Sequence, residues 1–371
     1  MNVLINAYSL TTGGGQRILK DFLQHLYEFV QNTNIEIYVF VPNRTNYMKF
    51  ENEKLKIFEL PSLLKKNVMR PLVKYYFQKQ IDLLKIDKVF SMGNIALNTE
   101  KPQLLLFHWP YAVYPEKYIW SNMDIKSYIN RKIRLYLFQK NLKYANTVIA
   151  QTENIERRLN KYYKIENIVT IPNSVDIDNH LLASPHRFNL PDGKKLLYLT
   201  YYYTHKNLEI FIPLAQKIKK AKLDYKIIIT IAENQHPSAK KFLEDVSKYK
   251  LQDVIYNIGP VNFDEISSLY AQCDAFIMPT LLESFGLTYV EAMYFKLPIL
   301  TSDRDFARVL CKDSAFYFDP LNADDILHTI KMAFSNHTLL QGKVNSYTSL
   351  LEGFPTSKDV TKRYVEEIIK L

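Results

Sequence analysis

The sequence predicts an α/β protein of two domains, each built around a mostly parallel sheet. Short apolar runs of strand length alternate with longer segments of helical periodicity along the whole chain, which is typical of parallel sheets covered by helices. The chain has 371 residues, more than one ordinary hydrophobic core accommodates. Apolar residues make up 47% of it and charged residues 23%, as expected for a soluble globular protein.

The chain begins with an expected strand at residues 3–7, a glycine-rich turn at 11–15 and an amphipathic helix at 17–30. This order brings backbone N–H groups to a helix start, where phosphate groups bind. The glycines of the turn are Gly13, Gly14 and Gly15. The third glycine of the dinucleotide fingerprint is missing, and no Lys-Ser or Lys-Thr follows as in a P-loop. The residues alone leave a phosphate site and a simple tight turn equally open.

Further strands are expected in the first half at residues 35–41, 55–60, 88–91, 103–107 and 147–150. His108 directly follows one of them. A side chain at the carboxyl end of a parallel strand lies where open α/β sheets bind ligands. A lone histidine is more often structural, so this position by itself decides nothing.

Positive charge is concentrated in the first half. Residues 1–176 hold 25 Lys and Arg against 15 Asp and Glu, whereas residues 177–371 hold 23 of each. A stretch at residues 63–77 interleaves large apolar residues with the cations Lys65, Lys66, Arg70 and Lys74, and a second basic helix is expected at residues 126–143. Both stretches suit an anionic membrane surface, and a solvated basic face is the alternative. Because no helix-turn-helix, zinc-finger or RNP pattern occurs, no nucleic acid is expected as a partner.

The two halves are joined at residues 168–176, where Pro172 and Asn173 are turn formers. A strand at 195–199 opens the second half, and Lys206 is expected to open the helix that follows. The remaining strands are expected at residues 225–231, 254–258, 275–278, 299–301 and 315–318, and helices at 264–271, 287–295, 322–334 and 357–369.

The most informative loop joins the strand at 275–278 to the helix at 287–295. Gly286 has no Cβ, so the backbone there can approach a ligand closely, and the helix start attracts an anion. Glu283 and Glu291 flank this loop and suit hydroxyl groups better than phosphate. A nucleotide-sugar combines these features. Acidic residues that serve only the helix dipole explain the same pattern, so both interpretations stay open.

Glu283 and Glu291 are separated by seven residues that include Ser284-Phe285-Gly286-Leu287, and Ala292-Met293 follows. This resembles the donor-site signature of the retaining nucleotide-sugar glycosyltransferases of family 4, the glycosyl transferases group 1, which have the GT-B fold. The passage at residues 168–176, the Lys206-Asn207 pair and the Gly-Gly-x-x-Arg of the first loop also resemble this family.

The resemblance implies two Rossmann-like α/β domains that face a central cleft. Residues 1–176 are the expected acceptor-binding domain, residues 177–355 the nucleotide-sugar domain, and residues 356–371 a helix that packs back on the first domain. The expected catalytic residues are Glu283, His108 and Lys206. The expected donor-binding residues are Gly13, Gly14, Gly15, Lys206, Ser284, Phe285, Gly286, Leu287 and Glu291. Thr200 and Tyr201 stand where the family has Gly-Arg, which removes one cation from the expected diphosphate clamp.

The expected function is the transfer of a sugar, with retention, from a UDP- or GDP-sugar to a lipid-linked or growing glycan in cell-surface polysaccharide assembly. A GT-B nucleotide-sugar epimerase and a binding-only relative are the alternatives. Asp176-x-Asp178 and Asp303-x-Asp305 resemble the metal-binding pair of the other glycosyltransferase fold, but the available positive charge makes a divalent metal unnecessary. No metal or other cofactor is therefore expected.

The expected location is the cytoplasm, at the inner face of the membrane. No apolar run reaches the ~18 residues of a membrane span. The N-terminus lacks the pattern of a signal peptide. Cys273 and Cys311 have no metal-like spacing and lie in apolar surroundings, as in a reducing compartment.

Overall fold

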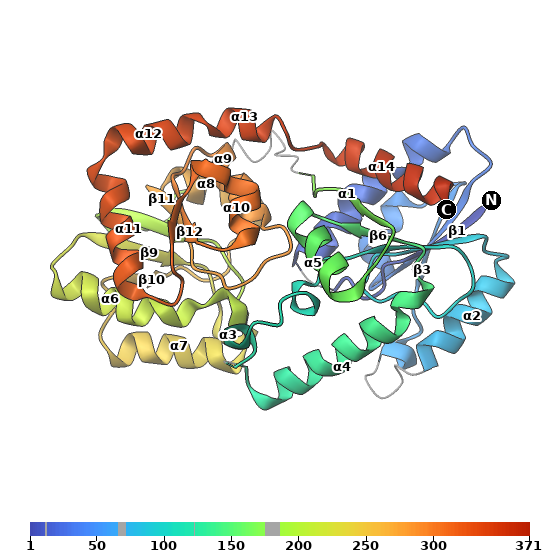
Figure 1. Ribbon diagram of the computed structural model, residues 1–371, viewed down its shortest axis with the longest axis horizontal. Coiled ribbons are helices and arrows are strands. Elements are labelled where there is room, and N and C mark those ends of the chain that lie inside the picture. Colours follow the sequence, from blue (N-terminus) through green and yellow to red (C-terminus); the bar gives the residue numbers. More distant parts are fainter. Residues whose placement is uncertain (12, 66–71, 122, 175–185) are drawn as a thin grey trace. The chain divides into compact units, whose positions relative to one another are not determined.

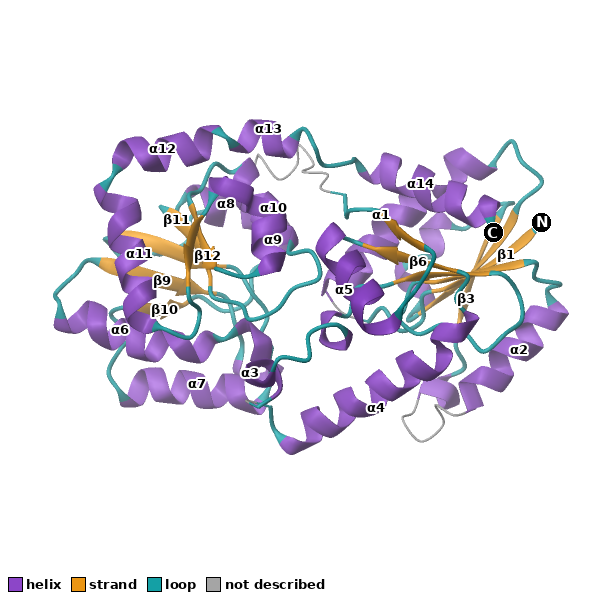
Figure 2. Ribbon diagram, viewed as in Figure 1, coloured by secondary structure: helices purple, strands orange, loops and turns teal. Residues whose placement is uncertain are grey.

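The computed structural model describes residues 1–11, 13–65, 72–121, 123–174 and 186–371 (Figure 1). The chain divides into two compact units. Unit 1 consists of Met1–Pro115, Asp124–Ser174 and Pro355–Leu371, and unit 2 of Glu116–Met123 and Val175–Phe354. Each unit contains a parallel sheet with helices around it, which confirms the predicted α/β fold class (Figure 2). The eight-residue segment Glu116–Met123 belongs to unit 2 although the chain on both sides of it belongs to unit 1.

In unit 1 the described residues form a seven-stranded sheet with the order β3-β2-β1-β4-β5-β6-β7, and all of its pairings are parallel. Its strands are β1 (Asn2–Asn6), β2 (Glu36–Val41), β3 (Leu55–Glu59), β4 (Lys88–Ser91), β5 (Gln103–Leu106), β6 (Thr147–Ala150) and β7 (Ile168–Thr170). The helices are α1 (Gly13–Val30), α2 (Val73–Leu83), α4 (Ile125–Asn141), α5 (Glu153–Tyr163) and α14 (Ser357–Lys370).

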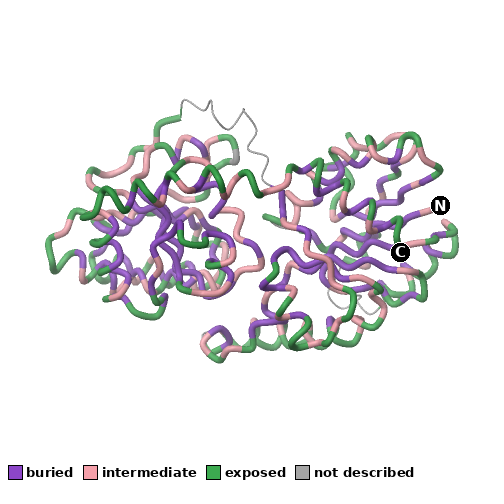
Figure 3. The backbone as a smooth tube through the Cα atoms, turned by 45° about the horizontal axis from the view of Figure 1, so that its top comes forward, coloured by how far each residue is buried: buried purple, intermediate pink, exposed green. Residues whose placement is uncertain are grey.

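The core of unit 1 lies on both faces of this sheet, because Val3, Leu4 and Ile5 in the middle of β1 are all apolar and successive side chains point to opposite faces. Val3 and Ile5 pack with residues of α1 and α14, whereas Leu4 packs with residues of α2. The strands are accordingly buried along most of their length (Figure 3). Polar groups at the sheet therefore concentrate at the strand ends, where the loops begin.

The last helix, α14, packs on α1 in unit 1, as predicted for the C-terminal helix. A capping box formed by Thr356 and Asp359 starts the helix. Tyr364 lies edge-on to Phe22 of α1, with 5.7 Å between the ring centroids. Arg363 donates a hydrogen bond of 2.8 Å to the carbonyl oxygen of Thr170 at the end of β7.

In unit 2 the described residues form a six-stranded parallel sheet with the order β10-β9-β8-β11-β12-β13. Its strands are β8 (Lys194–Tyr198), β9 (Tyr225–Ile229), β10 (Ile255–Asn257), β11 (Ala275–Met278), β12 (Ile299–Ser302) and β13 (Phe316–Phe318). The helices are α3 (Lys117–Trp120), α6 (Phe211–Lys220), α7 (Pro237–Lys248), α8 (Ile266–Ala271), α9 (Leu287–Tyr294), α10 (Asp305–Cys311), α11 (Ala323–Ser335), α12 (His337–Asn345) and α13 (Tyr347–Leu351).

Two expected helix starts were wrong. Helix α1 begins at Gly13 and includes all three glycines of the predicted turn. Lys206 does not open a helix but ends a 3-10 turn, Thr204–Lys206, and α6 begins only at Phe211. The reason for the second difference is Asn207, whose left-handed conformation, with φ 58°, ends the turn.

Candidate functional site

In unit 2 the order of the strands reverses between β8 and β11, since β9 and β10 follow on one side and β12 and β13 on the other. Loops that leave neighbouring strands in opposite directions open a crevice at such a point, outside the carboxyl ends of the strands. The loop after β8 contains Lys206, and the loop after β11 contains Glu283. The topology therefore brings together two residues that the sequence analysis singled out separately.

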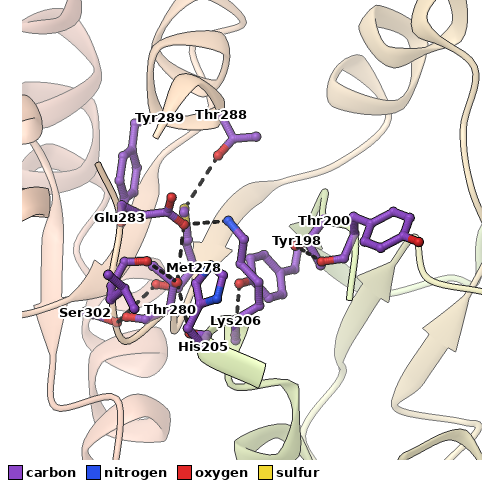
Figure 4. A network of polar contacts seen from close by, with 12 residues as sticks. Tyr198, Thr200, His205, Lys206, Met278, Thr280, Glu283, Thr288, Tyr289 and Ser302 are labelled. Carbon is purple, nitrogen blue, oxygen red and sulfur yellow. Dashed lines mark hydrogen bonds and ion pairs between the residues drawn. The ribbon is translucent and has the colours of Figure 1, made fainter. Parts of the chain in front are cut away.

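Lys206 and Glu283 form an ion pair at this point (Figure 4). Lys206 Nζ lies 2.5 Å from Glu283 Oε1, and the two side chains are only 17% and 13% exposed. Their enclosure strengthens the pair relative to one in water, because less solvent screens it. The ammonium group expected to face a diphosphate and the carboxylate expected to face a sugar are thus adjacent.

Asn207 joins the two loops that carry this pair. Its buried side-chain amide donates hydrogen bonds to the carbonyl oxygens of Pro279, at 3.1 Å, and Pro320, at 2.8 Å. The loops are joined again by the Leu281 N–H, which donates to the His205 carbonyl oxygen at 2.8 Å. Tyr198, at the end of β8, donates from its hydroxyl to the Lys206 carbonyl oxygen at 2.9 Å. The position of the Lys206 backbone is therefore set from three sides.

Thr280 lies beneath Glu283 and is fully buried. Its Oγ1 is 3.3 Å from Glu283 Oε1 and 3.1 Å from the His205 carbonyl oxygen, so its single hydroxyl hydrogen serves one of these acceptors at a time. The Thr280 carbonyl in turn accepts a hydrogen bond of 2.7 Å from Ser302 Oγ on β12 (Figure 4). The carboxylate is thus supported by residues from the ends of two neighbouring strands.

Gly286 is the N-cap residue of α9 and has a left-handed backbone, with φ 87°. A Cβ at this position would lie 2.8 Å from a ring carbon of Tyr289. The glycine is thus required by the backbone and by the buried Tyr289 ring, a reason different from the close ligand approach that the sequence suggested. The first turn of α9 begins at Leu287. Its backbone N–H groups are those that have no hydrogen-bond acceptor within the helix.

The other predicted donor-binding residues of this loop differ in their surroundings. Phe285 is buried and packs edge-on against Phe354, whereas Ser284 is partly exposed. Glu291 lies on α9 and is 8% exposed. Its Oε2 accepts a hydrogen bond of 3.2 Å from the hydroxyl of Tyr270 on α8. Glu291 is therefore held by α8, while Glu283 is held by the loop after β8.

In unit 1 the strand order reverses between β1 and β4, and the loops after these strands touch. A Cβ at Gly93, after β4, would lie 2.2 Å from Ser9 Oγ, after β1. Gly13, with φ 42°, and Gly14 have no such close neighbour. A Cβ at either position would have no atom of the described residues within 4 Å. These two glycines present their backbone to open space, which is compatible with a bound phosphate.

His108 follows β5 and is held by Asn94, which follows β4. The His108 N–H donates to Asn94 Oδ1 at 2.6 Å, and Asn94 Nδ2 donates to His108 Nε2 at 2.8 Å. Because Nε2 accepts, the proton of the neutral ring lies on Nδ1, which is enclosed and has no hydrogen-bond partner among the described residues. Burial of the ring nitrogens, with a smaller effect of Arg134, lowers the pKa of His108 to about 3. The histidine is therefore neutral, and its Nδ1–H group is enclosed.

Asn94 and Thr280 hold predicted site residues in place but were not themselves predicted from the sequence. Asn94 adopts a left-handed conformation with φ 68° and is almost fully buried. The Gly93-Asn94 dipeptide directly after a predicted strand was an available signal, because both residue types tolerate this conformation. Thr280 had no comparable signal, since a threonine after a strand and a proline is common in loops.

Comparison with known proteins identifies the family. A model described as Glycosyl transferases group 1 matches residues 185–348, and a model described as Glycosyltransferase Family 4 matches residues 12–179. Together the two models span most of the chain. The chain belongs to this family of glycosyltransferases.

Relatives and a solved structure agree with this assignment. The O-antigen chain mannosyltransferase RfbU of Salmonella typhimurium is 24% identical over 279 residues, which cover 73% of this glycosyltransferase and 74% of the relative. The alpha-monoglucosyldiacylglycerol synthase of Streptococcus pneumoniae is 24% identical over 254 residues, covering 64% of this chain and 56% of the relative. The structure of Anabaena Alr3699/HepE in complex with UDP-glucose superimposes with a TM-score of 0.72 at 15% identity over 100% of both chains. The fold is the predicted GT-B fold.

The glycosyltransferase departs from the family pattern at Tyr201, as the sequence indicated. Tyr201 is 50% exposed, and its ring lies 5.1 Å from that of Tyr203, which is 37% exposed. An exposed pair of aromatic rings thus occupies the loop in which the family has its second cation.

The carboxylates of the Asp-x-Asp alternative have other partners where they are described. Asp303 accepts hydrogen bonds from Arg308 Nε at 2.7 Å and from Nη2 at 2.9 Å, and these bonds are the main reason that its pKa is lowered. Asp305 Oδ1 accepts from the Phe306 N–H at the start of α10. Asp176 and Asp178 lie outside the described residues. Within the described ranges, no three His, Cys, Asp or Glu side chains gather as a metal site would require.

Two of the four cations predicted to contact a membrane are described. Lys65 forms an ion pair with Glu59 and donates to the Pro42 carbonyl oxygen at 2.9 Å. Lys74 lies over the ring of Tyr75, 4.6 Å from its centroid. Lys66 and Arg70 lie outside the described residues. None of the described helices is long and apolar enough to cross a bilayer.

Proposed function

We propose that this glycosyltransferase transfers a sugar from a UDP- or GDP-sugar, with retention, to a lipid-linked or growing glycan in polysaccharide assembly. The observation that carries the proposal is the enclosed Lys206–Glu283 pair at the strand reversal of unit 2. The O-antigen relative and the UDP-glucose complex of a protein with the same fold support the substrate classes.

Breakage of the bond between the anomeric carbon and the diphosphate oxygen leaves negative charge on the nucleoside diphosphate. Lys206 and the N–H groups at the start of α9, from Phe285 to Leu287, stabilise this charge, with the backbone of Gly13–Gly15 as a further donor. Each preorganised group of this kind contributes on the order of 10²–10³-fold in rate. This positive charge replaces a divalent metal, so the reaction is metal-independent.

Glu283 binds hydroxyl groups of the transferred sugar, and Glu291 binds the ribose. Neutral His108 lies close to the transferred sugar. Because no residue of the sequence stands out as a covalent nucleophile, we expect the acceptor oxygen to attack from the face that the diphosphate leaves. The acceptor proton passes to the departing phosphate, and the glycosidic bond forms with retention. The enzyme acts at the cytoplasmic face of the membrane, where its basic first half, including Lys65, Lys66, Arg70 and Lys74, meets anionic lipid.

A panel of UDP- and GDP-sugars, assayed with and without a lipid-linked glycan acceptor, tests this proposal. We expect turnover of one donor that rises with acceptor and is unchanged by a chelator. Release of free epimerised sugar would identify an epimerase instead, and donor binding without any turnover would identify a binding protein. A strict requirement for Mn²⁺ or Mg²⁺ would overturn the metal-independent reaction.

Variants of the two glutamates separate their roles. Glu283→Ala should reduce transfer by about 100-fold or more, since the removed carboxylate contacts the reacting sugar. Glu291→Gln should mainly weaken donor binding, by about tenfold or more, because one charged hydrogen bond is lost. Glu244→Ala, at an exposed position of α7, is the matched control and should leave both quantities unchanged. Wild-type transfer by Glu283→Ala protein would contradict the assignment.

A further inference from the structure

Helix α4 of unit 1 exposes an unusual amount of apolar surface. Ile125 is 79% exposed, Ile129 50%, Ile133 53% and Tyr136 60%, whereas Phe138 is the helix's buried residue. The three isoleucines are four positions apart and therefore share one face of the helix, and Tyr136 continues that face. Phe138 comes nine positions after Ile129, about two and a half turns, so it points the opposite way. We call the four exposed residues the outer stripe.

The opposite side of α4 is attached firmly to unit 1. Phe138 lies against Phe107, with 5.4 Å between the ring centroids. The guanidinium groups of Arg131 and Arg134 lie over the rings of Tyr111 and Trp109, at 4.5 and 4.7 Å. The outer stripe therefore cannot turn inward without breaking these contacts, and its exposure is a property of the folded unit.

The charge of the helix indicates what covers the stripe. Residues Ile125–Asn141 contain five basic side chains and no acidic one, and Lys126, Lys132 and Lys140 are exposed. An apolar stripe flanked by lysines is the pattern of a helix that lies in the interface of an anionic bilayer, with its apolar side chains below the headgroups. A large exposed apolar patch otherwise marks a partner surface. A second copy would bring the same unbalanced charges together, and nucleic acid would leave the isoleucines uncovered.

We propose that α4 is the helix by which this glycosyltransferase lies on an anionic phospholipid surface, with the outer stripe inserted among the headgroups. The inference rests on the proposed function, because it names the surface from which a membrane-anchored acceptor is presented. Helix α2 is the weaker candidate, since its Val73, Phe77 and Ile81 are buried in unit 1.

The test measures sedimentation of the full-length protein with vesicles of phosphatidylcholine, with and without phosphatidylglycerol. Wild type should sediment with the anionic vesicles, and Ile129→Gln/Ile133→Gln protein should bind at least about tenfold more weakly, because two inserted side chains become polar. Ile369→Gln is the matched control, since Ile369 is an isoleucine of α14 in unit 1 that is 49% exposed. It should bind like wild type. Unchanged thermal unfolding of all variants shows that folding is intact.

A Tyr136→Trp variant reports insertion directly, and its fluorescence should shift to shorter wavelength only with anionic vesicles. Equal binding by wild type and the double variant overturns the proposal. The proposal is also overturned if the protein forms a dimer that the double substitution dissociates. It is likewise overturned if an oligonucleotide displaces the bound vesicles and the vesicles cause no fluorescence shift. Donor turnover in the absence of vesicles should be the same in wild type and the double variant. Loss of turnover in every protein would instead count against the proposed function.

Discussion

At the scale of single residues, the candidate residues of each unit have a chemistry that is set by their enclosure. Lys206 and Glu283 are both more than four-fifths buried and therefore pair with each other. In unit 1, neutral His108 and Asn94 exchange two hydrogen bonds, while His108 Nδ1 has no partner among the described residues. The sequence predicted Lys206, Glu283 and His108 as site residues, but not the partners that determine their orientation.

The low pKa of His108 predicts a pH-dependent stability. The folded protein keeps the ring neutral down to a pH of about 3, whereas the unfolded chain takes up a proton near the ordinary value of 6.5. The stabilisation by neutral His108 is thus complete above pH 6.5 and is lost as the pH falls towards 3. Between pH 6.5 and 5, wild type should lose roughly 1.5 kcal/mol more stability than His108→Gln protein.

Denaturant unfolding at the two pH values measures this difference. His337→Gln, a substitution at an exposed position of α12, is the control and should follow wild type. Parallel pH profiles of wild type and His108→Gln protein would show that the ring is not enclosed in solution.

At the scale of elements, the site is made by loops at the ends of neighbouring strands. The network around Glu283 contains Tyr198 at the end of β8, Thr280 in the loop after β11 and Ser302 at the end of β12. Asn207 links the loop after β8 to the loops after β11 and β13, because it reaches both Pro279 and Pro320. We therefore expect Asn207 to position Lys206 for catalysis without contacting the substrate.

Substitution of Asn207 tests this role. Asn207→Ala should destabilise the protein by about 2–4 kcal/mol, since two buried carbonyl groups lose their donor and alanine tolerates the left-handed backbone poorly. Asn207→Gly removes only the hydrogen bonds and should be less damaging. Both should lower kcat more than they raise KM for the acceptor, because Lys206 is displaced from its pair.

Lys222→Ala is the matched control for the backbone. Lys222 has a similar left-handed conformation, with φ 52°, but it is exposed. Lys222→Ala protein should lose only the stability that the left-handed backbone costs an alanine, and it should keep full activity. If Asn207→Ala kept the wild-type kcat, the link between the loops would have no part in positioning Lys206.

At the scale of the whole molecule, charge and apolar surface are distributed unevenly. The entire net charge of +10 lies in residues 1–176, and six of the large exposed apolar residues lie on α4. The proposed membrane contact therefore has a salt-sensitive part from Lys and Arg and a salt-insensitive part from the isoleucines.

Vesicle binding at low and high salt should distinguish the contribution of the cations from that of the isoleucines. Replacing Lys65, Lys66, Arg70 and Lys74 together by Gln should weaken vesicle binding at low salt, at about 1 kcal/mol for each cation near the surface, and have little effect at high salt. The Ile129→Gln/Ile133→Gln substitutions should weaken binding at both. Donor affinity, measured without vesicles, should be unchanged in each protein. Unchanged vesicle binding by the quadruple variant would mean that these four cations do not contact the membrane.

The sequence by itself determined the α/β class, nearly all strand positions, the family and the identity of the main candidate residues. Alternation of apolar and helical segments is a local pattern, and Glu283 and Glu291 lie in one short segment, so both are visible without a structure. Only the tertiary structure decided that Lys206 pairs with Glu283, because the strand order that joins residues 77 positions apart is not encoded in local periodicity. The outward direction of the isoleucines on α4 and the placement of Glu116–Met123 in unit 2 were likewise decided by packing. A helix pattern states which residues share a face, but only the surrounding core decides which face is covered.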